Sequence, residues 1–315
     1  MCKTSQNYSS APFKRIFINK IDKLLAAYCP DIVISTVPIG SQYISAYKEY
    51  KATSLPLFTY ITDLFDHAEW IAKNTDVYFV GTHELKQLLV EKGISPKKIR
   101  VSGIPVKEAF KLSQHKQINN IKKKVLIMGG GLGLISFSDA LYDALAENPF
   151  IDVTVITGKN KNLFRSLKSK YPTFNTILYT NKVYEYMQSS DLLISKAGGI
   201  TVFEALHSEI PLYIINPFLL QEISNANYVE KRQLGVVTWN SDENTGLNLI
   251  KLLEDQAQLN LYKNNMRILK SELDSSAIIK ELNLRKGYID ESDINSTCNN
   301  PYRNFLIWGT TFRLL

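Results

Sequence analysis

Short apolar runs rich in β-branched residues alternate with amphipathic segments along most of the chain. Such runs, nearly continuous in apolar residues and separated by helical segments, are typical of parallel strands that are buried on both faces of a sheet. The pattern therefore predicts an α/β fold of the doubly wound type. The predicted strands span residues 32–37, 57–62, 77–80, 99–102, 125–128, 153–157, 177–179, 192–194, 212–215 and 236–239.

Helical patterns begin and end the folded region. A helix is predicted over residues 15–28, ahead of the first strand, and another over residues 246–253. A single longer helix is predicted over residues 256–284. Residues 297–315 carry no period that assigns them to an element.

The chain divides at a polar segment. Residues 107–124 are rich in Lys, Gln and Asn and lack a clear period, so they read as an interdomain linker with a boundary near Ile118. A chain of 315 residues also favours two domains. We expect a first domain in residues 1–118, a second in residues 119–290 and an unassigned tail in residues 291–315.

Composition places the chain among ordinary globular proteins, with 45% hydrophobic and 21% charged residues. Cys2, Cys29 and Cys298 lie far apart and show no paired spacing, so neither a disulfide framework nor a zinc site is predicted, and a reducing compartment fits. No apolar run is long enough to span a bilayer, and the start lacks the apolar core of a secretory signal. We therefore expect a cytoplasmic protein.

Positive charge is concentrated in the middle of the chain. Between Lys86 and Lys124 the basic residues greatly outnumber Glu91 and Glu108, the only acidic ones there. Such a stretch favours an anionic membrane surface or nucleic acid, although it also fits a solvated linker. Nucleic acid is disfavoured because no binding motif or group of stacking aromatic residues accompanies the charge.

The stretch from Ser195 to Leu206 follows a short apolar run and opens an apolar periodic one, so it reads as strand, glycine turn and helix. Gly198 and Gly199 let the backbone approach a ligand closely, and the first N–H groups of a helix favour an anion. Glu204 lies about one turn into this helix, where a carboxylate accepts hydrogen bonds from sugar hydroxyls. The alternative is an ordinary turn with a solvated glutamate.

Two further glycine turns follow predicted strands of the same domain. Gly129, Gly130, Gly131 and Gly133 come directly after the first strand, and Gly158 comes after the second. Loops at the carboxyl ends of parallel strands face one crevice, so a diphosphate is the natural ligand. No Gly-Lys-Ser/Thr follows and the dinucleotide spacing is incomplete, which disfavours ATP hydrolysis and NAD binding. The first domain, which begins with a helix, has no equivalent turn.

Residues 217–227 place polar side chains just after a strand, at a predicted helix start. Amide and carboxylate groups in this position suit the hydroxyls of a sugar, and they equally suit a polar helix cap. The side chains concerned are Gln221, Glu222, Asn225 and Asn227.

Taken in order, these motifs resemble one family. The set comprises residues 62–70 (TDLFDHAEW), 76–80, 103–106 (GIPV), the triple glycine, Thr180-Asn181, residues 195–204, Asn216-Pro217, Gln221-Glu222 and Asn225. It looks like the glycolipid glycosyltransferases that make monogalactosyl- and glucosyl-diacylglycerol, relatives of the peptidoglycan N-acetylglucosaminyltransferase. The resemblance covers about residues 14–281.

The resemblance implies a GT-B architecture of two Rossmann-like domains, with the UDP-sugar on the second and the lipid acceptor on the first. It implies no cofactor besides the donor substrate and no metal. Glu204 would hold the ribose, the glycines would line the diphosphate, the backbone near Val183 would read the uracil, and Gln221 and Glu222 would hold the sugar. The full predicted donor set is Gly129, Gly130, Gly131, Gly158, Val183, Gly198, Gly199, Ile200, Thr201, Glu204, Gln221, Glu222 and Asn225.

His67 is the candidate general base. It follows Asp63 by four residues in the loop after a predicted strand, and an imidazole with a carboxylate partner suits the activation of a hydroxyl. A structural histidine is the alternative. His83, His115 and His207 lack such a context and read as structural or surface residues.

The resemblance fails at the start of the chain. Nothing before Pro30 matches the strand, glycine-rich turn and Gly-His pair with which the family opens. The first domain therefore reads as truncated at its N-terminus. We expect either that a separate chain supplies this segment or that the chain is a fragment or decayed copy that binds the nucleotide-sugar without transferring it. The main prediction is hexose transfer from a UDP-sugar to diacylglycerol or a related lipid, by a protein peripheral on the cytosolic membrane face. Transfer of N-acetylglucosamine to a peptidoglycan lipid precursor is an alternative.

Overall fold

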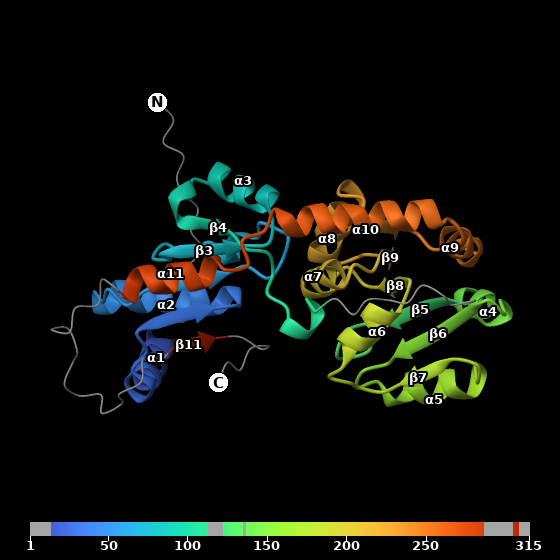
Figure 1. Ribbon diagram of the computed structural model, residues 1–315. Coiled ribbons are helices and arrows are strands. Elements are labelled where there is room, and N and C mark those ends of the chain that lie inside the picture. Colours follow the sequence, from blue (N-terminus) through green and yellow to red (C-terminus); the bar gives the residue numbers. More distant parts are fainter. Residues whose placement is uncertain (1–13, 113–121, 135–136, 287–304, 309–315) are drawn as a thin grey trace. The chain divides into compact units, whose positions relative to one another are not determined.

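The computed structural model describes residues 14–112, 122–134, 137–286 and 305–308. The chain splits into two compact units, one formed by Met1–Ile104 with Leu273–Leu315 and the other by Pro105–Glu272. Each unit is built on its own parallel sheet (Figure 1). The two units are described separately below.

The first unit contains a five-stranded sheet in the order β11-β1-β2-β3-β4. All neighbouring strands pair in parallel, and the register sets Val33 beside Leu57 and Phe58 beside Val77. Strand β11 adds to the edge of β1 although it comes from the tail that the sequence left unassigned. The strands are β1 (Ile32–Ser35), β2 (Leu57–Tyr60), β3 (Val77–Val80), β4 (Ile99–Val101) and β11 (Phe305–Trp308).

Helices cover both faces of this first sheet. On one face Val33 and Leu57 pack with buried side chains of α1 and α2. On the other face Ile34 and Phe58 pack with Ala277 of α11. The helices are α1 (Lys14–Tyr28), α2 (Pro38–Lys51), α3 (His83–Glu91) and α11 (Ala277–Lys286), with short 3-10 turns η1 (Ala68–Trp70) and η2 (Pro96–Lys98).

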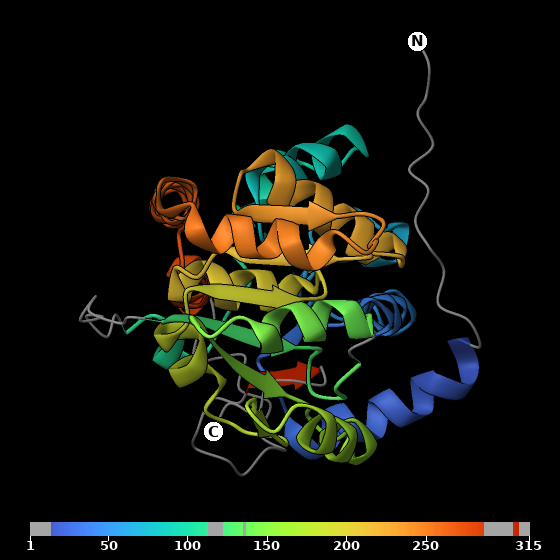
Figure 2. The ribbon, with the colours of Figure 1, turned by 90° about the vertical axis from the view of Figure 1, so that its right-hand side faces the viewer.

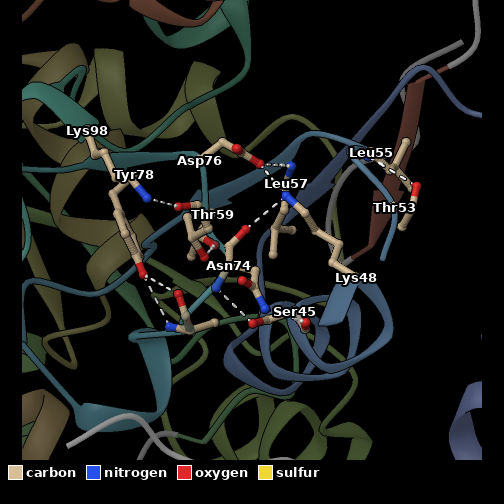
Figure 3. A network of polar contacts seen from close by, with 12 residues as sticks. Ser45, Lys48, Thr53, Leu55, Leu57, Thr59, Asn74, Asp76, Tyr78 and Lys98 are labelled. Carbon is tan, nitrogen blue, oxygen red and sulfur yellow. Dashed lines mark hydrogen bonds and ion pairs between the residues drawn. The ribbon is translucent and has the colours of Figure 1, made fainter. Parts of the chain in front are cut away.

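A polar network secures α2 to the sheet (Figure 3). Lys48 of α2 has a side chain only 9% exposed and pairs with Asp76 at 2.5 Å. Asp76 also accepts the backbone N–H of Leu57 at 2.8 Å, and Lys48 donates to the carbonyl of Asn74 at 3.0 Å. From the same helix, Gln42 donates to the carbonyl of Glu69 at 2.8 Å. This last bond anchors η1, the turn that directly follows His67, to α2.

The prediction of one long helix over residues 256–284 is wrong. Two helices, α10 (Gln256–Ser271) and α11, are separated by a turn in which Asp274 accepts the backbone N–H of Ser276 at 3.2 Å and its hydroxyl at 2.6 Å. Asp and Ser compete with the helical backbone for hydrogen bonds in this way and favour helix ends. Because of the break, α11 packs with the first unit, where the predicted second domain of residues 119–290 had not placed it.

The second unit contains a six-stranded parallel sheet in the order β10-β9-β8-β5-β6-β7 (Figures 1 and 2). Alternate residues, such as Ile127 and Ile194, pack on one face against α4, α5, α9 and α10. Their neighbours Leu126 and Leu193 are fully buried as well, so the sheet is covered on both faces. The strands are β5 (Lys123–Met128), β6 (Ile151–Ile156), β7 (Asn175–Ile177), β8 (Leu192–Ser195), β9 (Leu212–Ile215) and β10 (Gly235–Thr238).

The helices of this unit alternate with its strands. They are η3 (Glu108–Phe110), α4 (Asp139–Glu147), α5 (Lys161–Lys170), α6 (Val183–Ser189), α7 (Gly199–Ser208), α8 (Leu220–Lys231), α9 (Thr245–Glu254) and α10. Strand order reverses between β5 and β8, since β6 and β7 continue to one side and β9 and β10 to the other. Loops that leave two such neighbouring strands in opposite directions open a crevice at their carboxyl ends, where ligands bind in open α/β sheets.

The sequence predicted neither a membrane-spanning segment nor a disulfide framework. No helix in the part of the chain that the structure describes is both long enough and apolar enough to span a bilayer.

Cys29 takes part in a disulfide bond, which the spacing of the cysteines had not predicted. Pairing depends on how close two Cα atoms come in the fold, and sequence spacing does not report that distance.

Candidate functional site

The glycine turns after β5 and β6 pack backbone against backbone. Gly130 adopts a positive φ of 71°, and the turn closes through a 3.0 Å hydrogen bond from the Gly133 N–H to the Gly130 carbonyl. A Cβ on Gly158 would lie 2.5 Å from the Gly131 carbonyl oxygen, and the Lys159 N–H donates to that same oxygen at 3.0 Å. The structure thus brings the turn of Gly130 and Gly131 against that of Gly158, and the contact of these glycines and Gly129 with a donor stays a prediction.

The turn after β5 remains open on its outer side. Gly130 and Gly131 are exposed, and a Cβ built on either would meet no atom within 4 Å. The helix that follows this turn, α4, begins only at Asp139. The glycine turn therefore offers a ligand its own backbone, and the helix N-terminus in this crevice comes from α7.

Strand β8 delivers α7 to the crevice. The hydroxyl of Ser195 donates to the Met128 carbonyl at 2.8 Å and so ties the end of β8 to the end of β5. Helix α7 begins at Gly199 with Gly198 as its N-cap, and no side chain caps it. The first N–H groups of a helix have no partner within the helix and carry partial positive charge. Ile200 and Thr201, both half-buried, stand in this first turn.

Glu204 stands one turn further along α7. It is half-buried, and desolvation raises the pKa of its carboxyl group to about 7, an effect that the charge of Lys107 opposes. His207, on the following turn, has a pKa lowered to about 4, chiefly by burial and also by Lys111 and Lys270. The imidazole is therefore neutral at ordinary pH, in keeping with a structural residue.

Lys107 is a cation that the sequence did not reveal as part of this site. It precedes η3, and Gln188 of α6 holds η3 by donating to the carbonyls of Ala109 at 2.8 Å and Leu112 at 2.9 Å. Lys107 comes near Glu204 in this way although the two lie far apart in the sequence. No local signal in the polar segment distinguishes Lys107 from its neighbouring lysines.

The polar residues after β9 have different roles in the structure. Gln221 is exposed at the start of α8, whereas Glu222 is 8% exposed and accepts the Phe218 N–H at 3.3 Å. Lys196, which sequence reasoning also passed over, brings its ammonium to 3.8 Å from Glu222. Its position between β8 and Gly198, at the start of the glycine turn, is the sequence feature that could have identified Lys196 as part of the site.

Asn225 supports the site from behind. It is fully buried and donates its amide to the Ala197 carbonyl at 2.8 Å, so it fixes the turn that leads into α7. The sequence predicts a donor contact for Asn225, whereas in the structure its amide nitrogen donates to the protein itself. Val183, the residue predicted to lie near the base, is the half-buried first residue of α6.

Asn225→Ala is expected to destabilise the protein by about 1 to 3 kcal/mol, because it leaves the buried Ala197 carbonyl without its donor. Urea unfolding of both proteins measures the difference. Asn227→Ala, an exposed change on the same helix, is the control and should unfold as the wild type does. Equal midpoints for the two variants would remove the supporting role of Asn225.

The predicted pair of His67 and Asp63 lies close enough to interact electrostatically, but each residue has a different hydrogen-bond partner. Asp63 receives a hydrogen bond from the Trp70 side chain, and burial raises the pKa of its carboxyl group. His67 is half-exposed, its Nδ1 accepts the Glu69 N–H at 3.3 Å, and the Glu69 carboxylate lies 3.7 Å from the same nitrogen. A neutral His67 with Nδ1 as acceptor carries its proton on Nε2. Both residues belong to the first unit.

Two family models match the chain. Residues 2–106 match the model of monogalactosyldiacylglycerol synthase, and residues 124–282 match that of the glycosyltransferase family 28 C-terminal domain. The processive diacylglycerol beta-glucosyltransferase of Bacillus pumilus is 30% identical over 298 residues, which is 91% of this chain and 75% of the relative. The chain belongs to this family of glycolipid glycosyltransferases.

A second relative and two solved structures of much lower sequence identity are also similar to this chain. The relative of the same name from Staphylococcus carnosus is 29% identical over 281 residues and covers 86% of this chain and 71% of its own. The crystal structure of Acinetobacter baumannii MurG superposes with a TM-score of 0.64 at 14% identity, over 89% of this chain and 82% of that one. Anabaena HepE, solved with UDP, reaches 0.57 at 13% identity over 87% and 82%. The architecture is GT-B.

Proposed function

We propose that this glycolipid glycosyltransferase moves a hexose from a UDP-sugar to the hydroxyl of diacylglycerol or a related lipid. The observation that carries the proposal is the switch point of the second sheet, where the open glycine turn after β5 and the uncapped N-terminus of α7, the helix that carries Glu204, follow neighbouring strands. Glycine backbone and helix N–H groups suit a diphosphate, and a carboxylate suits a ribose. The names of the relatives supply the acceptor class.

Each part of the donor then has a partner in the second unit. The diphosphate lies against Gly130 and Gly131 and the first turn of α7, with the ammonium of Lys196 beside it. Glu204 accepts hydrogen bonds from the ribose hydroxyls. The uracil meets the backbone at the start of α6, near Val183, and Gln221 and Glu222 hold the sugar. Gly158, Gly198 and Asn225 shape the turns that these groups require.

Transfer proceeds by attack of the acceptor hydroxyl oxygen on the anomeric carbon of the sugar. The bond from that carbon to the diphosphate oxygen breaks, the hydroxyl proton passes to a base, and UDP leaves with its charge stabilised by the α7 N-terminus and backbone N–H groups. We propose that these groups carry out the role without a metal ion. Activity that persists unchanged in EDTA would support this part, and activity restored only by a divalent cation would overturn it.

The assay that tests the function incubates the protein with labelled UDP-glucose, UDP-galactose or UDP-N-acetylglucosamine and vesicles containing diacylglycerol. Lipid-dependent release of UDP together with a labelled glycolipid is the expected result. Tight UDP binding without any lipid-dependent release would show a binding protein instead. Vesicles without diacylglycerol serve as the control for hydrolysis of the donor.

His67→Gln is expected to lower kcat by about a hundredfold to ten-thousandfold, the usual effect of losing a general base. To act as the base in the wild-type protein, His67 has to rotate away from the Glu69 N–H. Its Nδ1, which now accepts that N–H, must instead face the hydroxyl of the acceptor lipid. Calorimetry should show unchanged UDP affinity, because His67 lies in the first unit. His83→Gln, at an exposed histidine of the same unit, is the control. A kcat within twofold of the wild type would remove His67 from the proton transfer.

Peripheral attachment to an anionic membrane forms the last part of the proposal, and the structure qualifies it. The basic stretch of residues 86–124 is shared between the two units. Several of its cations are already paired: Lys92 with Asp66, Arg100 with Glu281, Lys111 with Glu108 and Lys122 with Asp152. The exposed pairs among them contribute little stability and leave their cations able to exchange partners, whereas the carboxylate that holds Arg100 belongs to the buried Glu281. Binding to anionic vesicles should therefore weaken steeply with added salt.

A further inference from the structure

An apolar surface lies beside the predicted sugar contacts in the second unit. Phe218, Leu219 and Leu220 lead from the end of β9 into α8, and they are 66%, 43% and 70% exposed. Single exposed apolar residues are common on protein surfaces, but three large ones in succession mark an interaction site. These three residues are called the apolar lip below. None of the groups assigned above to the donor uses their side chains.

The backbone of the apolar lip is held firmly on both sides. Asn216, just before it, donates to the Ser241 hydroxyl at 2.7 Å and accepts the Ser241 N–H at 2.8 Å. Within the lip, the Phe218 N–H donates to the buried carboxylate of Glu222 at 3.3 Å. Pro217, between these anchors, is buried. The lip is thus a built feature that presents apolar side chains on a fixed backbone.

The charges around the lip do not favour an anionic partner. The ammonium of Lys196 lies 5.0 Å from the centre of the Phe218 ring, but it also pairs with Glu222 at 3.8 Å. At the end of the neighbouring strand, the exposed Asp242 and Glu243 add negative charge. A partner that meets this surface gains from apolar contact and gains little from Coulombic attraction. A neutral, apolar partner fits best.

The area of the lip argues against a folded protein as that partner. A stable protein interface buries about 800 Å² on each side, more than three side chains of this size provide. Insertion among lipid chains needs no matching surface of that extent. Trp239, 37% exposed, directly follows β10, and the Thr238 carbonyl at the end of that strand accepts the Asn216 N–H at 2.8 Å. Tryptophan and leucine at one edge are the composition of membrane-interface segments.

We propose that the apolar lip inserts into the interfacial region of a lipid bilayer, so that the second unit itself contacts the membrane. The purpose of this contact rests on the proposed function: Gln221 and Glu222 follow the lip directly, so the sugar that they hold would lie at the surface where a lipid hydroxyl is found. Membrane attachment then has a salt-resistant apolar component besides the electrostatic one of the basic stretch.

Vesicle binding tests the lip directly. The variant Phe218→Ser, Leu219→Ser, Leu220→Ser and the wild type are sedimented with phosphatidylcholine vesicles, with and without diacylglycerol, at low and high salt. The variant is expected to lose at least about tenfold in partition coefficient at both salt concentrations. The control is Leu247→Ser, Leu261→Ser, Ile268→Ser, which removes three side chains 55%, 42% and 59% exposed from α9 and α10 and should bind as the wild type does. Equal binding by the lip variant, or a wild type without salt-resistant binding, overturns the proposal.

A second experiment tests insertion by a property that the variant gains, namely quenching of a newly introduced tryptophan, and so does not depend on a loss of binding. Phe218→Trp is expected to show fluorescence quenched by brominated phospholipids beyond the level of the native tryptophans, whereas Ile268→Trp on α10 should show no added quenching. Absence of extra quenching for Phe218→Trp in bound protein overturns insertion. Concentration-dependent self-association that disappears in the lip variant would do the same, since it would assign the lip to a second copy of the chain.

Failure of the lip and failure of the proposed function give different results. If the wild type binds neutral vesicles through the lip but releases no UDP with any lipid, the transfer function fails and the lip stands. If transfer occurs and the lip variant performs it equally well from vesicles, the lip fails and the function stands. With diacylglycerol in detergent micelles, the lip variant should transfer at the wild-type rate, and melting curves confirm that it is folded.

Discussion

Glu204→Ala is expected to raise the dissociation constant of UDP by roughly tenfold to 150-fold. This corresponds to the loss of charge-assisted hydrogen bonds worth about 1.5 to 3 kcal/mol. Isothermal titration calorimetry with UDP measures the change, and Glu254→Ala, at an exposed position of the same unit, is the control. Unchanged affinity in Glu204→Ala would remove this residue from the ribose contact.

The raised pKa of Glu204 makes the same contact dependent on pH. With a pKa of about 7, only a minor fraction of the carboxyl groups is ionised at pH 6 and most are ionised at pH 8. If the carboxylate is the form that binds the ribose, UDP affinity increases by up to roughly tenfold over this range, because apparent affinity scales with the competent fraction. Glu204→Gln should lose that dependence, which separates the role of the charge from a general effect of pH on the protein.

Stability must change in the opposite sense. The unfolded chain releases the Glu204 proton near pH 4.5 and the folded protein near pH 7, so between these values the folded state binds more protons. The contribution of this group to stability is fully present below pH 4.5 and is lost as pH rises through about 7. At pH 8, Glu204→Gln should therefore melt higher than the wild type without ligand, although it binds UDP more weakly. Such a residue is retained for its ligand and at a cost to the fold.

Gly158→Ala is expected to lower the free energy of unfolding by about 2 to 4 kcal/mol. Its φ of +56° strains an L residue, and the added Cβ would lie 2.5 Å from the Gly131 carbonyl oxygen, which belongs to a backbone that cannot move away alone. The turn after β5 must shift, and UDP binding is lost with it. Denaturant unfolding and calorimetry together report both effects.

Gly131→Ala provides the matched comparison. Its Cβ points into open space with no atom within 4 Å, so the stability of the protein should not change. UDP affinity should nevertheless decrease at least about tenfold, because the methyl group occupies the space proposed for the diphosphate. If Gly131→Ala binds UDP normally while remaining folded, the diphosphate lies elsewhere.

Much of the fold could be predicted from the sequence because its signals are local. Parallel strands buried on both faces are continuous apolar runs, and each predicted run contains or overlaps a strand of β1 to β10. The interruption between α10 and α11 was missed because a short Asp-Ser turn inside a helical pattern resembles one weak turn of helix. Strand β11 was missed because its four residues pair with β1, far away in the sequence.

In the candidate site, too, some features could be predicted from the sequence and others are seen only in the structure. Glycine turns after strands, and Glu204 one turn into α7, are visible in the sequence because position along a strand or helix determines where such residues lie. Only the tertiary structure brought Lys107 near Glu204, used the Asn225 amide for the Ala197 carbonyl and gave the Glu69 N–H to His67. Sequence determines which groups stand at a strand end. Which partner each group takes, and how far burial shifts its pKa, depends on segments that only folding brings together.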